Sequence, residues 1–140
     1  MEALEKITSA IGKKLEGRKP SLDRDDNLWD AAVLLPLVNT PQGVSVLFEV
    51  RAAKLGWQPG DVCFPGGRAE CSDESFEATA VRETCEELGL ESSCIKITGG
   101  LNYLVTHMGP LMLVILTAPG RLILTGTKLK KFLPCRLTFY

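Results

Sequence analysis

The sequence predicts one domain of the α/β class, in which helices pack on a β-sheet. Segments 2–16 and 74–88 each repeat apolar side chains at the spacing of an amphipathic α-helix. Between them, residues 31–51 contain an apolar run, a turn-like link and an alternating run, which is typical of two paired strands. A chain of 140 residues has the size of one domain, so we expect residues 1–140 to form a single unit with its own core.

The first predicted element is a helix over residues 2–16 that covers the core. Its apolar side consists of Leu4, Ile7, Ile11 and Leu15. A polar loop at 17–29 separates this helix from a buried strand at 31–38, whose residues are apolar throughout. Turn-forming residues at 39–43 and an alternating strand at 44–51 follow, so the two strands are expected to form a hairpin.

The second half begins with a loop rich in glycine and proline, residues 52–67, which includes a short strand at 61–64. The next element is a helix over 74–88, whose apolar side chains lie toward one side. The residues that bound this helix are expected to be its N-cap, Ser72 or Asp73, and its C-terminal stop, Gly89. Two further strands, at 94–98 and 101–105, complete the predicted α/β pattern.

The composition argues against several classes of protein. The longest apolar run, residues 111–118, is much shorter than the ~20 residues that span a bilayer, so no membrane partner is expected. The five cysteines are odd in number and form no CxxC pair, which is typical of reduced thiols in a cytoplasmic protein. The basic residues Lys128, Lys130 and Lys131 lack interleaved aromatic residues, so no nucleic acid partner is expected. The sequence leaves a homodimer open.

The clearest chemical feature is a group of carboxylates on the second predicted helix. Glu83, Glu86 and Glu87 stand at positions i, i+3 and i+4, which places them on one helical face, where they repel one another. Taken alone, they are also typical of a solvated helix face. The glycine pair Gly66-Gly67 before the helix lets backbone approach a ligand closely, however, and clustered carboxylate oxygens are ligands that Mg²⁺ prefers. The guanidinium of Arg82 can hold a neighbouring carboxylate in one rotamer.

The segment from Gly66 to Leu90 resembles the signature of the Nudix hydrolase family. The second half of that signature reads Arg-Glu, an aliphatic residue, any residue, Glu-Glu, any residue, glycine and an aliphatic residue. The matching residues are Arg82, Glu83, Glu86, Glu87, Gly89 and Leu90. Two positions depart from the signature: six residues instead of five separate Gly67 from Glu74, and Thr84 replaces the aliphatic residue.

The extra residue is typical of a Nudix branch that cleaves coenzyme A, which commonly carries acids near the positions of Glu70 and Asp73. This branch also has an upstream signature, Leu-x-x-x-Arg-(Ser/Ala)-x-x-Leu, followed by a glycine and Val-x-Phe-Pro-Gly-Gly. The residues that fit it are Leu47, Arg51, Ala52, Leu55, Gly60, Val62, Phe64, Pro65, Gly66 and Gly67. Gly56 departs, because the branch usually has a basic residue there. The resemblance covers about residues 31–112.

The resemblance implies a Nudix fold, a mixed β-sheet between helices, and hydrolysis of a diphosphate that links a nucleoside to another group. Mg²⁺ or Mn²⁺ would polarise the phosphoryl oxygens and activate a bound water. The implied metal ligands are Glu83, Glu87 and then Glu86, the implied catalytic residues are Glu83, Glu86 and Arg82, and the implied substrate-binding residues are Arg51, Gly66 and Gly67. Glu83 is the local candidate for the general base, and Arg51 is alternatively a solvated strand end.

The resemblance implies a small nucleotide substrate of the coenzyme A type, which would give 4′-phosphopantetheine and adenosine 3′,5′-bisphosphate. Two alternatives stay open. One is another Nudix specificity, such as ADP-ribose or a dinucleotide polyphosphate. The other is a non-catalytic nucleotide-binding Nudix module. This alternative is disfavoured by the intact carboxylates of Glu83, Glu86 and Glu87.

The distribution of charge predicts a frameshift near the C-terminus. Residues 92–140 contain no acid, whereas all 17 acids lie before them. With allowed codons, residues 121–140 read in a shifted frame give INPNRNEVEEIFTVPVDFL, which resembles the Asn-x-x-Glu-Val-x-Glu-(Ile/Val)-Phe-x-Val-Pro segment of the coenzyme A branch. We therefore expect a shift between about His107 and Pro119, a tail from about residue 113 that departs from the family, and a fold that is incomplete there. Resequencing of DNA and transcript tests this expectation.

Overall fold

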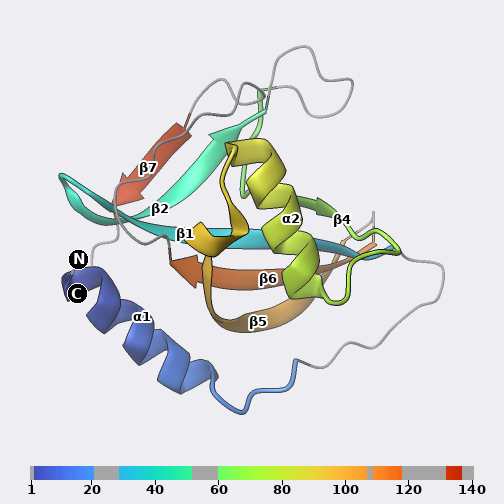
Figure 1. The fold of residues 1–140 in the computed structure, drawn as a ribbon, viewed down its shortest axis with the longest axis horizontal. Helices are drawn as coiled ribbons and strands as arrows, with labels where there is room; N and C mark the ends of the chain where they lie inside the picture. The colour runs from blue at the N-terminus through green and yellow to red at the C-terminus, as the bar shows by residue number, and fades with distance from the viewer. Residues whose placement is uncertain (1, 21–28, 52–59, 107–108, 118–131, 137–140) are drawn as a thin grey trace.

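The computed structural model describes residues 2–20, 29–51, 60–106, 109–117 and 132–136. Within these ranges the chain forms two α-helices, a short 3₁₀-helix and a seven-stranded sheet (Figure 1). The predicted α/β class is therefore confirmed. None of the helices in the described ranges is both long and apolar enough to cross a membrane.

The main path of the sheet runs in the order β3-β2-β1-β6-β5. At its centre, β1 (Ala31–Thr40) and β2 (Gly43–Val50) form the antiparallel hairpin that the sequence predicts. On its other side β1 pairs in parallel with β6 (Gly109–Thr117), and β6 pairs antiparallel with β5 (Lys96–Thr106). The short β3 (Val62–Cys63) pairs with the end of β2. Since the sheet contains parallel and antiparallel pairs, the predicted mixed sheet is confirmed.

Two further strands lie off this path. The strand β4 (Gly66–Arg68) pairs with the first residues of β1 and so carries the glycine pair to the centre of the sheet. The backbone of β7 (Phe132–Arg136) pairs with β2. Neither strand was expected from the sequence, and β6 was not expected either. A run of three residues such as β4 gives no periodic signal, and the continuous apolar run in β6 shows no alternation. The strand β7 lies in the tail that was expected to depart from the family, whereas β3 lies within the short strand expected at 61–64.

One strand stands where the sequence predicts two. The expected strands at 94–98 and 101–105 are parts of β5, which runs without interruption from Lys96 to Thr106. The register against β6 shifts between Ile97 and Gly99 and again between Gly100 and Tyr103. The glycine pair therefore marks an irregularity within one strand instead of a turn between two.

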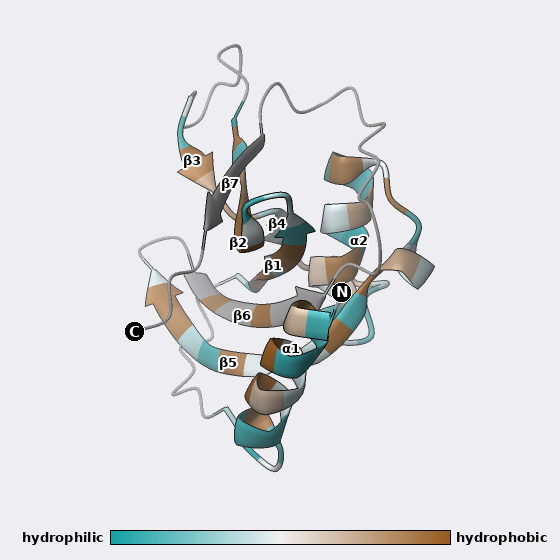
Figure 2. Cartoon of the chain, turned by 90° about the vertical axis from the view of Figure 1, so that its left-hand side faces the viewer, coloured by the Kyte–Doolittle hydropathy of each residue, from teal (hydrophilic) through white to brown (hydrophobic). Residues whose placement is uncertain are grey.

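The two helices cover opposite faces of the sheet. The first, α1 (Glu2–Leu15), has apolar and polar residues on different sides, seen as brown and teal in Figure 2. The second, α2 (Phe76–Leu88), lies across β1 in Figure 1. One core cluster, on the α2 side, consists of Ala32, Leu34, Ala80 and Val114. The other, on the α1 side, consists of Leu4, Leu37, Val44 and Val46. Ala32 and Leu34 of β1 thus pack toward α2, whereas Leu37 packs toward α1, because successive side chains of a strand point to opposite faces of the sheet.

The ends of α2 show one correct and one wrong prediction. Gly89 ends the helix with a positive φ of 66°, as expected of a glycine C-cap. The N-cap is Ser75, whose Oγ accepts a hydrogen bond of 3.1 Å from the backbone N–H of Ala78, so the predicted cap at Ser72 or Asp73 is wrong. The carboxylate of Asp73 is bound instead by a residue two turns into the helix, which is described below.

Candidate active site

The predicted carboxylates of α2 do not all face the same environment. The side chain of Glu83 is 20% exposed and that of Glu86 is 54% exposed. Glu87 is partly buried, and one of its carboxylate oxygens accepts a hydrogen bond of 3.0 Å from the backbone N–H of Gly66. Glu83 lies beside Gly67, where an added Cβ atom would stand 2.5 Å from its carboxyl carbon. Glu83 and Glu87 therefore lie against β4, whereas Glu86 lies at the rim.

The two glycines of β4 leave space for different neighbours. At Gly66, whose φ is 153°, a Cβ atom would lie 2.3 Å from the backbone oxygen of Ala32 on the neighbouring strand. At Gly67 the same atom would instead collide with the carboxylate of Glu83, the movable end of a side chain. The glycine pair thus lets β4 approach β1 and also seats a carboxylate of α2. The predicted contact of these glycines with substrate stays a prediction.

Replacement of these two glycines by alanine is expected to have different results. Gly67→Ala displaces the Glu83 carboxylate, so we expect the hydrolysis that the family resemblance implies to fall by about 10²-fold while the melting temperature changes little. Gly66→Ala forces backbone against backbone, so we expect it to destabilise the fold itself, by roughly 1–3 kcal/mol or more. Turnover assays and thermal melts of the two variants test the distinction. Equal losses of stability in both variants would contradict it.

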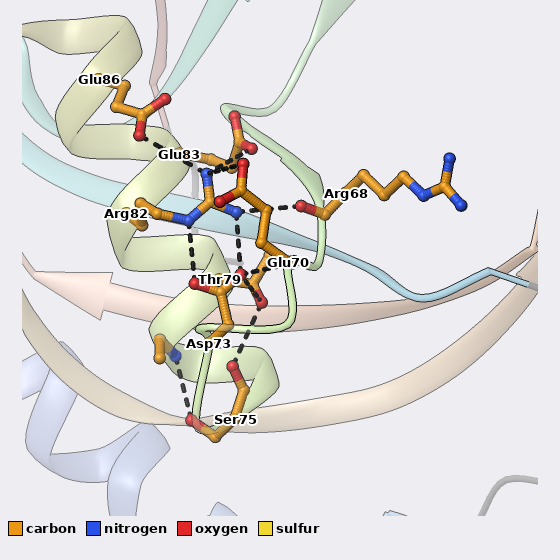
Figure 3. A network of polar contacts seen from close by, with 9 residues as sticks. Arg68, Glu70, Asp73, Ser75, Thr79, Arg82, Glu83 and Glu86 are labelled. Carbon is orange, nitrogen blue, oxygen red and sulfur yellow. Dashed lines mark hydrogen bonds and ion pairs between the residues drawn. The ribbon is translucent and has the colours of Figure 1, made fainter.

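Arg82 is the centre of a polar network that fixes Glu83 (Figure 3). Its Nε and Nη2 atoms each donate a hydrogen bond of 2.9 Å to one carboxylate oxygen of Asp73. Its Nη1 donates to Glu83 at 2.8 Å, and its Nη2 also donates to the backbone oxygen of Arg68 at 3.0 Å. Because the guanidinium is planar and has several donors, it ties the loop before α2 to one carboxylate of the helix.

Asp73 is held in place from three sides. Besides Arg82, it accepts hydrogen bonds of 2.9 Å from the hydroxyl of Thr79 and from the backbone N–H of Glu70. The hydrogen bonds from Arg82, and then that from the Glu70 backbone, hold the pKa of Asp73 well below its usual range. Asp73 therefore stays ionised and keeps the arginine in one orientation. From the sequence, Asp73 was a candidate N-cap and, through the family resemblance, an acid typical of the branch, but not a partner of Arg82.

A further carboxylate, which was not among the predicted site residues, lies beside the helix. Glu49 on β2 is only 3% exposed. Its Oε1 accepts a hydrogen bond of 3.1 Å from the thiol of Cys63, and its Oε2 is buried without a hydrogen-bond donor among the residues that the structure describes. The signal was present in the sequence, since Glu49 stands between Phe48 and Val50 in a largely apolar strand.

Burial shapes the ionisation of this group of carboxylates. Burial raises the pKa of Glu87 to about 8, and the nearby charge of Glu49 acts in the same direction. Burial also raises the pKa of Glu49 above its ordinary value. It raises the pKa of the Cys63 thiol to about 12, with the hydrogen bond to Glu49 adding to the effect. Like charges that are buried together disfavour ionisation, whereas a bound cation would favour it.

The stability of the metal-free protein is therefore expected to depend on pH. Because the folded pKa of Glu87 lies above its ordinary value of 4.5, the folded state holds this proton more tightly than the unfolded state does. The resulting stabilisation is complete below about pH 4.5 and is lost as the pH rises through about 8. In EDTA, the melting temperature should fall over this range, and it should fall less in Glu87→Gln. An equal fall in both proteins would contradict the assignment.

Arg51 lies at the end of β2, close to this group. Its backbone N–H donates to the backbone oxygen of Asp61 at 2.9 Å, and its positive charge offsets part of the burial-driven rise in the pKa of Glu49 and Cys63. Its Nε atom is buried without an acceptor among the described residues. The side chain is half-buried rather than a solvated strand end. Its contact with a substrate phosphate stays a prediction. His107 and the tail lysines lie outside the described residues.

The donor set suits a hard divalent cation. In the part of the chain that is described, no three side chains of His, Cys, Asp or Glu already converge as a metal site. Glu83 and Glu87 nevertheless offer carboxylate oxygens on neighbouring turns of α2, and Glu49 offers a buried oxygen with no donor. Carboxylate oxygens of this kind are ligands for Mg²⁺ and Mn²⁺. The residues therefore fit a cation held between α2, β2 and β4.

Comparisons with known sequences agree with this geometry. A family model described as the NUDIX domain matches residues 28–124. A probable nudix hydrolase of Schizosaccharomyces pombe is 54% identical over 59 residues, which make up 42% of this chain and 21% of that protein. A peroxisomal coenzyme A diphosphatase of Mus musculus is 40% identical over 70 residues, or 50% of this chain and 30% of that protein. The chain thus spans less than a third of the length of these two relatives.

Solved structures show the same fold. A Nudix hydrolase from M. smegmatis is 27% identical, with a TM-score of 0.59 over 76% of this chain and 70% of that one. The NUDIX domain of Shewanella oneidensis NrtR, crystallised with ADP ribose, is 17% identical, with a TM-score of 0.53 over 88% of this chain and 80% of that one. At this low identity, the second likeness concerns the fold alone. The predicted arrangement of a sheet between helices therefore agrees with known structures.

Proposed function

Because this chain belongs to the NUDIX domain family, we propose that it hydrolyses diphosphates that link a nucleoside to another group, with coenzyme A or its derivatives as the preferred substrate. The products are 4′-phosphopantetheine and adenosine 3′,5′-bisphosphate. The observation that carries the proposed activity is the position of Glu83 and Glu87 against the glycine strand β4. The family as a whole generally uses divalent metal ions such as Mg²⁺ or Mn²⁺.

The coenzyme A specificity rests on the segment before α2. Residues 47–67 fit the upstream signature of the coenzyme A branch, and six residues separate Gly67 from Glu74. The likeness to the murine coenzyme A diphosphatase supports the same choice, although it extends over half of this chain. An ordered loop before the helix is also consistent with it, since Asp73 and Glu70 from that loop reach Arg82.

In this proposal each residue has a distinct task. Glu83 and Glu87 would hold the cation, with Glu86 at the rim. When bound, the ion would supply polarisation of the phosphoryl oxygens and a lowered pKa of a water. Arg82 keeps Glu83 in one rotamer through its hydrogen bond of 2.8 Å. Glu83 is the local candidate to take the proton of the attacking water, and Arg51 faces the negative charge of the substrate.

A comparison of substrates tests the specificity. The purified chain is incubated with Mg²⁺ or Mn²⁺ and with coenzyme A, ADP-ribose or Ap4A, and kcat/KM is measured for each. The proposal predicts the highest value for coenzyme A. A higher value for ADP-ribose or Ap4A would retain the hydrolase and overturn the coenzyme A branch. Binding of nucleotide without turnover of any of them would favour a non-catalytic module.

The same assay tests whether the acid-free tail derives from a frameshift. We propose that residues from about 113 onward derive from a shifted reading frame. Two observations support this: residues 92–140 contain no acid, and residues 121–140 read in a shifted frame resemble a segment of the coenzyme A branch. A frame-restored version is therefore expected to be more stable and more active than the chain as written, because the family sheet is then covered. Equal melting temperatures and equal kcat/KM values for the two versions would contradict this part of the proposal.

A further inference from the structure

We propose that Glu49 of β2 is a further ligand of the metal ion, contributed from outside the helix motif. The inference rests on the proposed function, because it assumes a divalent cation at Glu83 and Glu87. It adds a residue from a different element, so that ligands from the sheet and from α2 would hold the cation together. Nothing in the helix signature points to this position.

The first argument is the burial of the Glu49 carboxylate. The residue is only 3% exposed, yet one of its two carboxylate oxygens has no hydrogen-bond donor among the residues described. A buried carboxylate is costly unless it is paired, hydrogen-bonded or bound to a metal. The thiol of Cys63 satisfies only Oε1. Among the described residues Oε2 has no donor other than a neighbouring carboxyl: Glu49 and Glu87 are joined by a side-chain hydrogen bond, which requires a proton on one of them. A divalent cation would replace that proton and keep both carboxylates ionised.

The second argument is the direction of the side chain. Val44, Val46 and Phe48 pack in the core cluster on the α1 side of the sheet. Because side chains alternate along a strand, Glu49 points to the opposite face, which α2 covers. There its charge acts on Glu87, and that of Glu83 acts on Glu49. The carboxylates of Glu49 on β2 and of Glu83 and Glu87 on α2 thus act on one another in pairs from two elements.

Neither of the two arginines of the site, Arg82 and Arg51, makes an ion pair with Glu49 in the described residues. Arg82 donates to Asp73 and Glu83 and makes no contact with Glu49 in the described structure. Arg51 acts on Glu49 only through its charge, and its buried Nε makes no hydrogen bond to a described residue. Glu49 and Glu87 are therefore not neutralised by an ion pair in the residues described. A divalent cation supplies the missing positive charge and a partner for Oε2.

Direct measurement of metal binding tests this inference without any substrate. The Kd for Mn²⁺ is measured by isothermal titration calorimetry for the full chain, Glu49→Gln, Glu87→Gln and the matched control Glu91→Gln, whose side chain is exposed. We expect Glu49→Gln to weaken binding at least about tenfold and Glu91→Gln to leave it unchanged. Because glutamine removes a buried charge, the melting temperature of metal-free Glu49→Gln should equal or exceed that of the parent.

The outcomes separate this inference from the proposed function. Loss of Mn²⁺ binding in Glu87→Gln together with parental binding in Glu49→Gln would overturn the role of Glu49 alone. Absence of binding in the parent chain would overturn both. If Glu49→Gln does not fold, the Kd of Glu49→Asp for Mn²⁺ is measured instead. Aspartate is one methylene shorter, so its carboxylate is withdrawn from the site and Mn²⁺ binding must become weaker. Parental affinity in Glu49→Asp would contradict the inference.

Discussion

Replacement of Glu87 by glutamine is expected to lower the proposed Mg²⁺-dependent hydrolysis of coenzyme A by about 10²- to 10³-fold. The substitution keeps the size of the side chain and removes the charge that holds the cation, which supplies several kcal/mol of transition-state stabilisation. Glutamine can still accept the hydrogen bond from the Gly66 backbone, so the position of β4 should be preserved. Steady-state kinetics at saturating Mg²⁺, with a circular dichroism spectrum of each protein, measures the effect.

Glu91→Gln is the matched control for this experiment. Glu91 follows α2 directly, is exposed and lies outside the group of buried carboxylates. Its replacement makes the same chemical change as Glu87→Gln away from the buried carboxylates, so we expect parental kinetics. Full activity in Glu87→Gln would show that the metal assignment on α2 is wrong. An equal loss in both variants would attribute the effect to net charge.

Replacement of Arg82 by lysine is expected to lower turnover by about 10²-fold. Lysine keeps the charge but lacks the planar guanidinium group. It therefore cannot bind the two carboxylate oxygens of Asp73 and, at the same time, the carboxylate of Glu83. Glu83 then samples other rotamers, and a displacement of about 1 Å at a reacting group can reduce a rate about a hundredfold. Turnover of coenzyme A and the Kd for Mn²⁺, measured in parallel, report the loss.

Arg68→Lys provides a control with the same change of residue type. Arg68 takes part in the network only through its backbone oxygen, and its side chain points away from the other labelled residues in Figure 3. That side chain lies over the ring of Trp29, with 5.2 Å between the guanidinium carbon and the ring centroid. We therefore expect parental turnover. Parental turnover in Arg82→Lys as well would contradict the positioning role of Arg82.

The elements with a strong periodic signal could be predicted from the sequence. The two helices have one apolar side each, and the hairpin joins an apolar run to an alternating one. Gly89 was predictable because a left-handed C-cap favours glycine. The N-cap was misassigned, since Asp73 and Ser75 are both good caps in isolation and the competing hydrogen bonds to Arg82 appear only in the tertiary structure.

The site was predictable only where its residues lie close together in the sequence. The carboxylates of α2 could be predicted from their spacing, and Gly66 and Gly67 from the glycine-rich loop in which they lie. The contact of Gly67 with Glu83 requires β4 to pair with β1, which no short-range pattern encodes. Glu49 comes to α2 through the pairing of β2 in the sheet, so its distance in sequence concealed it.

The most direct test of the central claim is the identification of the products that the chain forms from coenzyme A. The protein is incubated with coenzyme A and Mg²⁺, with and without excess EDTA, and the products are quantified by liquid chromatography and mass spectrometry. The account predicts equimolar 4′-phosphopantetheine and adenosine 3′,5′-bisphosphate, formed only when the metal is available. Intact coenzyme A under conditions in which the same protein cleaves ADP-ribose would contradict it.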